Sequence, residues 1–282
     1  MRVHKAVITA AGEKQRHLPL QTIVDAKGRS RKVLGLLIDE VASAGIENVC
    51  VVVRPGTAAL YSEAADEATA DVTFVEQSEP KGYGHAVLCA AEFTGNDPFM
   101  LMVSDHIYVS DSASKTCAQQ LVASAERESC VVSAVQSTPE SRLSYFGAIG
   151  GTLFDASRDL YEVTRVLEKP TPTLAEQQIM TPGLRTGHYL CYLGMHVLQP
   201  LVLEVLARRE TQLKDGERLE LSPALNEVAG IGRYLAHAIE GRRYDLDRRH
   251  GLLIGQLAVS LAGEYRDEVL SSIVDLLARG KN

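Results

Sequence analysis

The sequence predicts an α/β fold built on a doubly wound, mostly parallel but mixed sheet, with helices at the C-terminus. Two observations support this fold class. Short apolar runs alternate with amphipathic segments through the first 135 residues, a pattern typical of parallel strands joined by crossover helices. The chain then ends in two segments whose apolar residues recur at helical spacing.

The first half of the chain supplies five strands and the helices between them. Residues 3–9 form an unbroken apolar run, as expected of a buried first strand, and residues 10–31 are polar and rich in turn residues. In such a sheet, ligands bind beyond the C-terminal ends of the strands. Strands are expected at 3–9, 48–53, 72–75, 99–103 and 130–135, and helices at 33–44, 57–65, 84–93 and 112–126.

The second half alternates less regularly, and its strands are expected to extend the sheet and cover the ligand crevice. The apolar stripes of the last two helices suit packing against the core or against a second copy of the chain, and the sequence leaves both open. Strands are expected at 145–151, 161–168, 184–197 and 233–238, and helices at 199–208, 222–228, 252–262 and 265–279.

Composition narrows the class of protein. The 282 residues carry a formal net charge of −7, which argues against a strongly basic nucleic-acid binder. The five cysteines are widely spaced, so they indicate neither a zinc knuckle nor a disulfide framework. The apolar run near the N-terminus is too short for a signal peptide or a membrane span. We therefore expect a cytoplasmic protein without nucleic-acid or membrane partners.

The loop after the first strand could hold an anion. Ala11 and Gly12 follow the strand directly, and a glycine there lets backbone N–H groups approach a base or a phosphate. Lys14 and Arg16 add positive charge. A single glycine meets neither the dinucleotide fingerprint nor the P-loop pattern, so an ordinary solvated loop is an equal alternative.

A second loop, residues 77–84, follows the third strand and opens a helix. The amide of Gln77 can both donate to and accept from a base edge. Gly82 and Gly84 permit close backbone approach, and Lys81 adds a cation beside a helix N-terminus. The alternative is a β-turn whose glycines only begin the helix.

Charged residues at strand ends provide further candidates. Asp105 follows the fourth strand and suits a Mg²⁺ ligand, and Asp245 could be a second carboxylate on the same ion. The alternative for Asp105 is a helix or turn cap, and Asp245 or Asp247 could cap the helix that follows them. Glu168 could accept sugar hydroxyls and Lys169 could neutralise a phosphate, although an exposed charged turn would show the same pattern.

Taken together and in this order, these segments resemble the sugar-phosphate nucleotidyltransferases, and within them the bacterial UTP–glucose-1-phosphate uridylyltransferase branch. The most specific match is residues 77–87, with Lys81-Gly82-x-Gly84-His85-Ala86-Val87. The resemblance spans nearly the whole chain. Its segments are residues 6–19, 75–87, 99–107, 166–170, 186–189 and 243–251.

The resemblance implies a role for each candidate residue. Ala11, Gly12, Gln77 and Gly82 would hold the uracil, with Lys14 on the triphosphate. Asp105 and Asp245 would hold Mg²⁺. Lys169 would bind the phosphate of the sugar. The sugar side would be lined by Gly147, Glu168, Lys169 and Gly187.

The sequence also departs from the family pattern. The usual Gly-x-Gly-Thr-Arg loop is here Gly12-Glu13-Lys14-Gln15-Arg16. The lysine of the family's Pro-Lys pair falls on Ala26, one residue before Lys27, and that segment also suits a plain turn. The late Asp-x-Gly motif becomes Asp245-Leu246-Asp247. Arg16, with Lys14 or Lys27, would stabilise the pyrophosphate side of the reaction.

The implied reaction joins UTP and a sugar 1-phosphate, glucose 1-phosphate by default, into a UDP-sugar with loss of pyrophosphate. In-line transfer needs positioning and charge neutralisation rather than a protein nucleophile. The alternative is a nucleotide- or sugar-nucleotide-binding protein on the same fold with weak or no catalysis. We expect residues 1–250 to form the nucleotidyltransferase domain, with sugar-binding strands in its second half, and residues 251–282 a helical extension.

Overall fold

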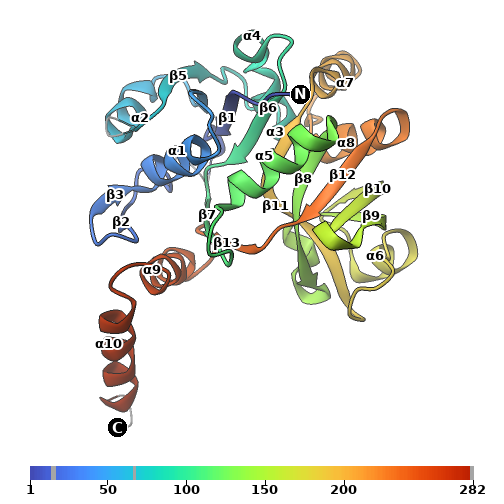
Figure 1. Ribbon diagram of the computed structural model, residues 1–282. Helices are drawn as coiled ribbons and strands as arrows, with labels where there is room; N and C mark the ends of the chain where they lie inside the picture. The colour runs from blue at the N-terminus through green and yellow to red at the C-terminus, as the bar shows by residue number, and fades with distance from the viewer. Residues whose placement is uncertain (14–16, 66–67, 280–282) are drawn as a thin grey trace.

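The computed structural model describes residues 1–13, 17–65 and 68–279. Within them the main sheet has nine strands in the order β5-β4-β1-β6-β11-β8-β12-β10-β9 (Figure 1). The strands are β1 (Lys5–Thr9), β4 (Asn48–Val53), β5 (Asp71–Glu76), β6 (Phe99–Val103), β8 (Val131–Pro139), β9 (Gly147–Asp155), β10 (Leu160–Glu168), β11 (His188–Leu198) and β12 (Tyr234–Ala238).

The predicted α/β class and mixed sheet are confirmed. Strands β5, β4, β1 and β6 run parallel, as do β8 and β12. Strand β11 lies antiparallel between β6 and β8, and β10 and β9 complete an antiparallel flank. The fifth strand predicted from the sequence, β8, therefore does not lie beside the fourth, β6, because β11 occupies the place between them.

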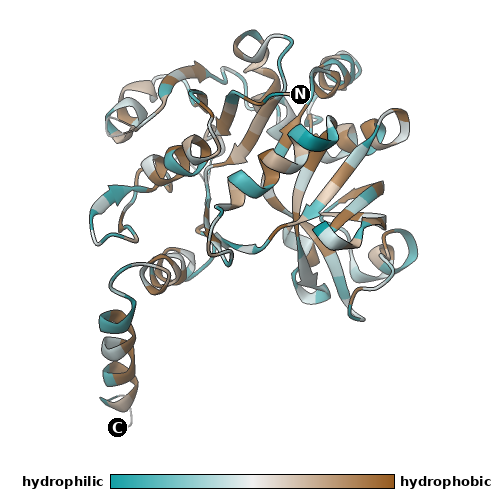
Figure 2. Cartoon of the chain, viewed as in Figure 1, coloured by the Kyte–Doolittle hydropathy of each residue, from teal (hydrophilic) through white to brown (hydrophobic). Residues whose placement is uncertain are grey.

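Helices cover both faces of the sheet because successive strand side chains point to opposite sides. Ile8 of β1 belongs to the buried cluster beneath α1 (Val33–Ser43), α2 (Ala58–Ala64) and α5 (Cys117–Glu128). Val7 belongs to the cluster beneath α3 (Tyr83–Leu88), α7 (Pro200–Glu210) and α8 (Leu221–Ile231). Figure 2 shows the hydrophobic residues concentrated along the central strands between these helices. The apolar strand runs thus form a core with two sides.

Three local features differ from the sequence prediction. The turn-rich segment before α1 contains a hairpin, β2 (Thr22–Val24) with β3 (Ser30–Lys32). The predicted helix at 84–93 is divided into α3 and α4 (Ala91–Thr94). A separate ribbon pairs β7 (His106–Ser110) with β13 (Gly241–Asp245), which lie far apart in the sequence. Short helix α6 (Pro172–Gln178) follows β10.

The C-terminal helices take different positions. Helix α9 (Gly251–Leu261) lies against β7, β13 and β2, whereas α10 (Arg266–Arg279) contains no buried residue and projects from the body (Figure 1). Both helices were predicted. Across the described residues, no helix combines the length and the apolar composition needed to cross a membrane.

Candidate active site

The predicted nucleotide loop follows β5 and is held from several sides. The backbone N–H of Gln77 donates to the carbonyl of Val53, and its buried side-chain amide donates to the carbonyl of Gly82 at 3.1 Å. The same amide nitrogen lies 2.9 Å from Nδ1 of His85, which accepts if that ring nitrogen carries no proton. Gln77 therefore ties the two ends of the loop together.

The glycines of this loop have a packing reason as well as the predicted ligand role. Gly82 has φ +114°, and a Cβ there would lie 2.5 Å from the carbonyl oxygen of Leu219. Leu219 donates its N–H to Lys81 and accepts from Gly84 at 2.8 Å. The close approach of this second backbone segment requires glycine. The loop is shaped by the segment before α8, which the sequence did not reveal.

Asp105 directly follows β6, as predicted, and is mostly buried. Its Oδ1 lies 2.7 Å from Nδ1 of His106, with side chains only 14% and 12% exposed. Its backbone carbonyl accepts from Leu246 at 2.8 Å. In the β7–β13 ribbon, Asp245 is directly opposite His106. The ribbon therefore places the two residues that the sequence paired at neighbouring backbone positions.

The carboxylate of Asp245 accepts hydrogen bonds from residues of its own turn. Its Oδ1 accepts from the N–H of Asp247, and its Oδ2 accepts from Nε of Arg248, both at 3.0 Å. Helix α9 begins at Gly251 after an N-cap residue, His250, that makes no side-chain capping bond. Neither aspartate therefore caps that helix, and the capping alternative is wrong for Asp245 and Asp247.

Two buried polar atoms of the residues on either side of Asp105 make no hydrogen bond to a described residue. They are Ser104 Oγ and His106 Nε2. Burial raises the pKa of the nearby Tyr83, its side-chain hydrogen bond with Thr9 lowers it, and the charges of Asp105 and Glu168 raise it, so this hydroxyl is neutral. A buried polar group without a partner costs about 1–3 kcal/mol. The end of β6 therefore suits a polar ligand. Thr9 and Tyr83 were not among the predicted site residues, although both lie inside predicted segments, residues 3–9 and 77–84.

The donor set fits a hard divalent cation. Asp105 and Asp245 offer carboxylate oxygens, the ligands that Mg²⁺ prefers, and the unpartnered hydroxyl of Ser104 belongs to the residue before Asp105. In the described part of the chain no group of three or more His, Cys, Asp or Glu side chains could enclose a metal ion. A cation here would therefore take its remaining ligands from water and from substrate phosphates.

Three of the four predicted sugar residues meet where the start of β9 pairs with the end of β10. Gly147 is paired with Glu168 in the sheet register. Glu168 accepts from the hydroxyl of Ser222 at 2.5 Å and lies 3.5 Å from Nζ of Lys169. Lys169 has φ +46°, and its backbone donates to Phe146. The structure therefore places Gly147, Glu168 and Lys169 together.

The space beside Gly147 is closed by an aromatic ring. A Cβ at Gly147 would lie 2.7 Å from the ring of Tyr192. Gly187 lies apart from this group: it has φ +71°, and its carbonyl accepts from Glu140. No described contact joins Gly187 to Gly147 or Glu168.

Lys27 lies at the tip of the β2–β3 hairpin. The carboxylate of Asp25 accepts from the N–H groups of Lys27 and Arg29, so the tip is a turn that side-chain hydrogen bonds stabilise. The side chain of Lys27 lines a shallow hollow with Arg29, Arg31 and Asp39. Described contacts thus do not bring Lys27 to Asp105. Lys14 and Arg16 lie outside the described residues, whereas Ala11 and Gly12 follow β1 at the expected strand end.

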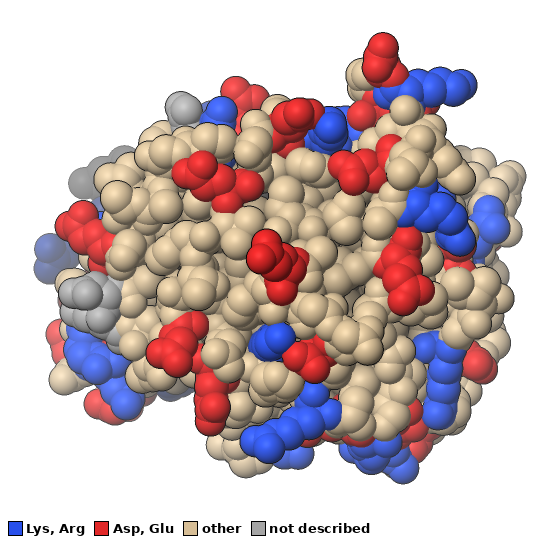
Figure 3. All heavy atoms as spheres, turned by 90° about the horizontal axis from the view of Figure 1, so that it is seen from above, with Lys and Arg blue, Asp and Glu red and all other residues tan. Residues whose placement is uncertain are grey.

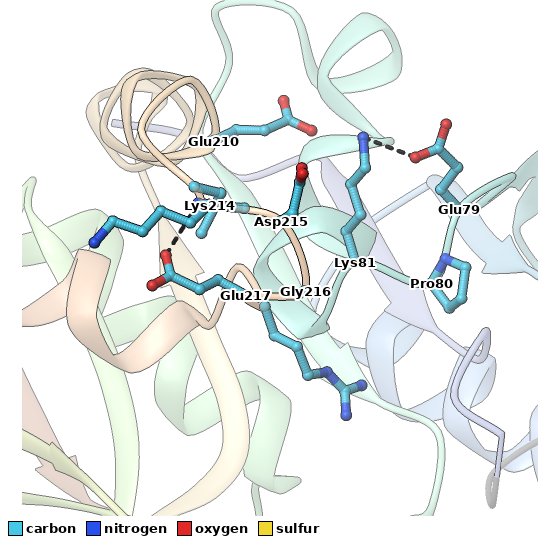
Figure 4. Close-up of a pocket in the computed structure, with 10 residues that line it drawn as sticks. Glu79, Pro80, Lys81, Glu210, Lys214, Asp215, Gly216 and Glu217 are labelled. Carbon is cyan, nitrogen blue, oxygen red and sulfur yellow. Dashed lines mark hydrogen bonds and ion pairs between the residues drawn. The ribbon is translucent and has the colours of Figure 1, made fainter.

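A separate cavity of about 460 Å³ opens beside the Gln77 loop (Figure 4). Lys81 and Glu79 line one side and form an ion pair of 2.8 Å, and the connection between α7 and α8 lines the other. Neither Asp105 nor Asp245 lines it. Figure 3 shows acidic and basic side chains interspersed over the face viewed from above, without a broad basic patch there.

Comparison with known proteins gives the family. The nucleotidyl transferase family model matches residues 5–232. UTP–glucose-1-phosphate uridylyltransferase of Bacillus subtilis is 28% identical, with 98% of each chain covered, and a Streptococcus pyogenes serotype M1 enzyme of the same name is 25% identical. A solved UDP-glucose pyrophosphorylase with UDP-glucose has the same fold, with a TM-score of 0.75, 22% identity and coverage of 91% of this chain and 98% of that one. The chain therefore belongs to the nucleotidyl transferase family.

Proposed function

We propose that this protein is a UTP–glucose-1-phosphate uridylyltransferase, which makes UDP-glucose and pyrophosphate. The family and the full-length similarity to curated uridylyltransferases support this activity. The structural observation that carries it is the β7–β13 ribbon. The ribbon places Asp245 opposite His106, the residue after Asp105, and we expect ligands to bind at these strand ends in this fold class.

Different residues would position the base, the sugar and the phosphate of the substrates. The Gln77 loop would bind the base, with Ala11, Gly12 and Gly82 providing close backbone approach. Glu168 would accept hydroxyls of the sugar, and Lys169 would hold its phosphate in line with the α-phosphorus of UTP. Lys14, Arg16 and Lys27 remain predicted partners of the triphosphate, and Gly187 remains a predicted part of the sugar side.

A divalent cation, which we propose is Mg²⁺, would be held by Asp105 and Asp245. When bound, it would neutralise charge on the α-phosphate and on the attacking phosphate. The protein's own task is to orient two polyanions and exclude water around the buried polar atoms at the end of β6. No protein nucleophile is required, because the attacking oxygen belongs to the sugar phosphate.

The decisive experiment measures pyrophosphate release from UTP, glucose 1-phosphate and Mg²⁺. Asp105→Asn keeps the shape of the side chain but removes its charge, so it should lower the rate at least ~10²-fold while the protein stays folded. Asp111→Asn is a matched control, because Asp111 is exposed and pairs only with Arg242 among described residues. Normal turnover in Asp105→Asn would refute the metal assignment.

The second candidate is a nucleotide-binding protein with little catalysis. The departure of residues 12–16 from the family pattern favours it. Calorimetric binding of UTP without pyrophosphate release, with all four nucleoside triphosphates and several hexose 1-phosphates offered, would select this candidate. Release that depends on UTP, on glucose 1-phosphate and on Asp105 would exclude it.

A further inference from the structure

Arg248 forms an ion pair with the carboxylate of Asp245, which is a proposed ligand of the metal. Its Nε donates to Oδ2 of Asp245 at 3.0 Å, and its guanidinium carbon lies 3.2 Å from the ring centre of Tyr145. The side chain is 37% exposed, and that of Asp245 is 18% exposed. The guanidinium is thus stacked on an aromatic face at the mouth of the site and paired with a candidate metal ligand.

The stacked ring belongs to the sugar side of the site. Tyr145 is followed by Phe146, whose carbonyl accepts from the backbone of Lys169. The guanidinium carbon of Arg243 lies 3.6 Å from the ring centre of Phe146, and the guanidinium donates to the carbonyl of Tyr192 at 2.6 Å. Arg248 therefore bridges the carboxylate of Asp245 to the segment that leads into Gly147.

Arg248 and a divalent cation would compete for Asp245. A doubly charged ion attracts a carboxylate more strongly than a single guanidinium charge does, and it repels that guanidinium at short range. A partly exposed ion pair contributes only about 0.2–1 kcal/mol, so it is readily exchanged. Stacking on Tyr145 contributes a similar amount and would keep the released guanidinium near the site.

We propose that Arg248 is an exchangeable ligand: it holds Asp245 before the metal binds and then moves to the phosphate of the sugar 1-phosphate. This inference rests on the proposed function and extends it to a residue that the sequence did not select. The planar fork of a guanidinium binds phosphate through two parallel hydrogen bonds, which a lysine cannot reproduce. Lys169 enters the same region from β10, so the phosphate would meet two cations.

The test measures two affinities that do not require turnover. Mn²⁺ binding to the full chain is followed by electron paramagnetic resonance without substrate, and glucose 1-phosphate binding is followed by calorimetry with saturating Mn²⁺. In Arg248→Gln, Mn²⁺ should bind about twofold to fivefold more tightly because its competitor is gone. Glucose 1-phosphate should bind at least ~10-fold more weakly because a charged hydrogen bond is lost.

Two further variants separate this role from a structural one. Arg242→Gln removes a neighbouring cation on β13 that pairs with Asp111, so both affinities should stay unchanged. Arg248→Lys should restore part of the Mn²⁺ competition and little of the sugar-phosphate affinity. A lower melting temperature in Arg248→Gln, with both affinities unchanged, would show that Arg248 only locks the turn and would overturn the proposal.

The outcome also separates this proposal from the proposed function. Suppose that the wild-type protein releases pyrophosphate and that Arg248→Gln has the same affinities for Mn²⁺ and glucose 1-phosphate as the wild type. The proposed function would then stand, and the exchange would be refuted. Wild-type protein that neither releases pyrophosphate nor binds glucose 1-phosphate would refute both. Opposite changes in the two affinities, limited to Arg248 variants, would support the exchange.

Discussion

At the scale of single residues, Gln77 combines a structural and a predicted binding role. Its amide nitrogen already joins Gly82 to His85 across the loop. A base edge would have to bind a side chain that is fixed in place by these contacts. This preorganisation favours selectivity, because little side-chain freedom remains to be lost on binding.

Gln77→Ala should therefore weaken UTP binding and reduce the preference for UTP over the other triphosphates. We expect a loss of roughly 10-fold in relative kcat/KM, since one or two hydrogen bonds to the base would go. His85→Ala is the matched control, because it removes one contact of the loop but no proposed contact to the base. An equal loss in both variants would show that loop order, rather than base reading by Gln77, sets the preference.

The residue scale also shows what the sequence could and could not predict. Asp105, Gln77 and Glu168 were found because each ends or follows an apolar strand or belongs to a specific motif. Arg248 and Tyr145 were missed because their stacking joins segments about 100 positions apart, and no local pattern records such a contact. The packing of Leu219 against Gly82 was missed for the same reason.

At the scale of elements, helix α10 shows an apolar stripe that no described residue buries. Leu270, Val274, Leu276 and Leu277 are 40–71% exposed. The charged residues of the helix are Asp267, Glu268 and Asp275 against Arg266 and Arg279, so its net charge is negative and does not suit an anionic membrane surface. A 14-residue helix is marginal by itself in water and needs a packing partner. We propose that the partner is α10 of a second copy.

Leu277→Asp should then lower the apparent mass in solution to that of one chain. Losing this contact in both copies weakens association on the order of 100-fold or more. Ser272→Asp adds the same charge on the polar side of the helix and should leave the mass unchanged. The measurement is light scattering after size exclusion over a range of concentrations; wild-type protein that is monomeric at every concentration would refute the pairing.

Elements were predicted well where one periodicity dominates a long segment. Strands β1, β4 and β6 are mostly apolar runs. Helix α5 was predicted to begin at residue 112 but begins at Cys117, after a capping box at Thr116 and Gln119 that the prediction did not use. The hairpin β2–β3 and the ribbon strands β7 and β13 were not predicted, because each is short, partly exposed and paired with a partner that only the tertiary fold supplies.

At the scale of the whole molecule, two buried histidines link stability to pH. Burial lowers the pKa of His196 to about 3, and burial followed by the charge of Arg127 lowers that of His237 to about 4. His196 is held by the hydroxyl of Ser133 at 2.6 Å, within a network that continues to Tyr234. In the unfolded chain both imidazoles regain an ordinary pKa near 6.5.

Stability should therefore fall as pH decreases from about 6.5 towards 4. In this pH range the unfolded chain binds more protons than the folded one. Each additional proton lowers the free energy of unfolding by about 1.4 kcal/mol for each pH unit of decrease. Urea unfolding at pH 7, 6 and 5 measures this slope. His196→Asn should reduce it by up to one proton, while His17→Asn, at an exposed position, should not. A slope unchanged in His196→Asn would mean that His196 takes up its proton without unfolding.

The contact between Gln256 and the hairpin has a consequence for how the chain behaves in a crowded solution. The Gln256 amide accepts from the N–H of Val24 at 2.8 Å and donates to its carbonyl at 2.9 Å, which imitates one rung of a neighbouring strand. Glu264 bonds to Ala26 farther along the same hairpin. A chain shortened before α9 would expose this strand edge as a template for pairing with other chains. The C-terminal segment thus protects the hairpin against aggregation.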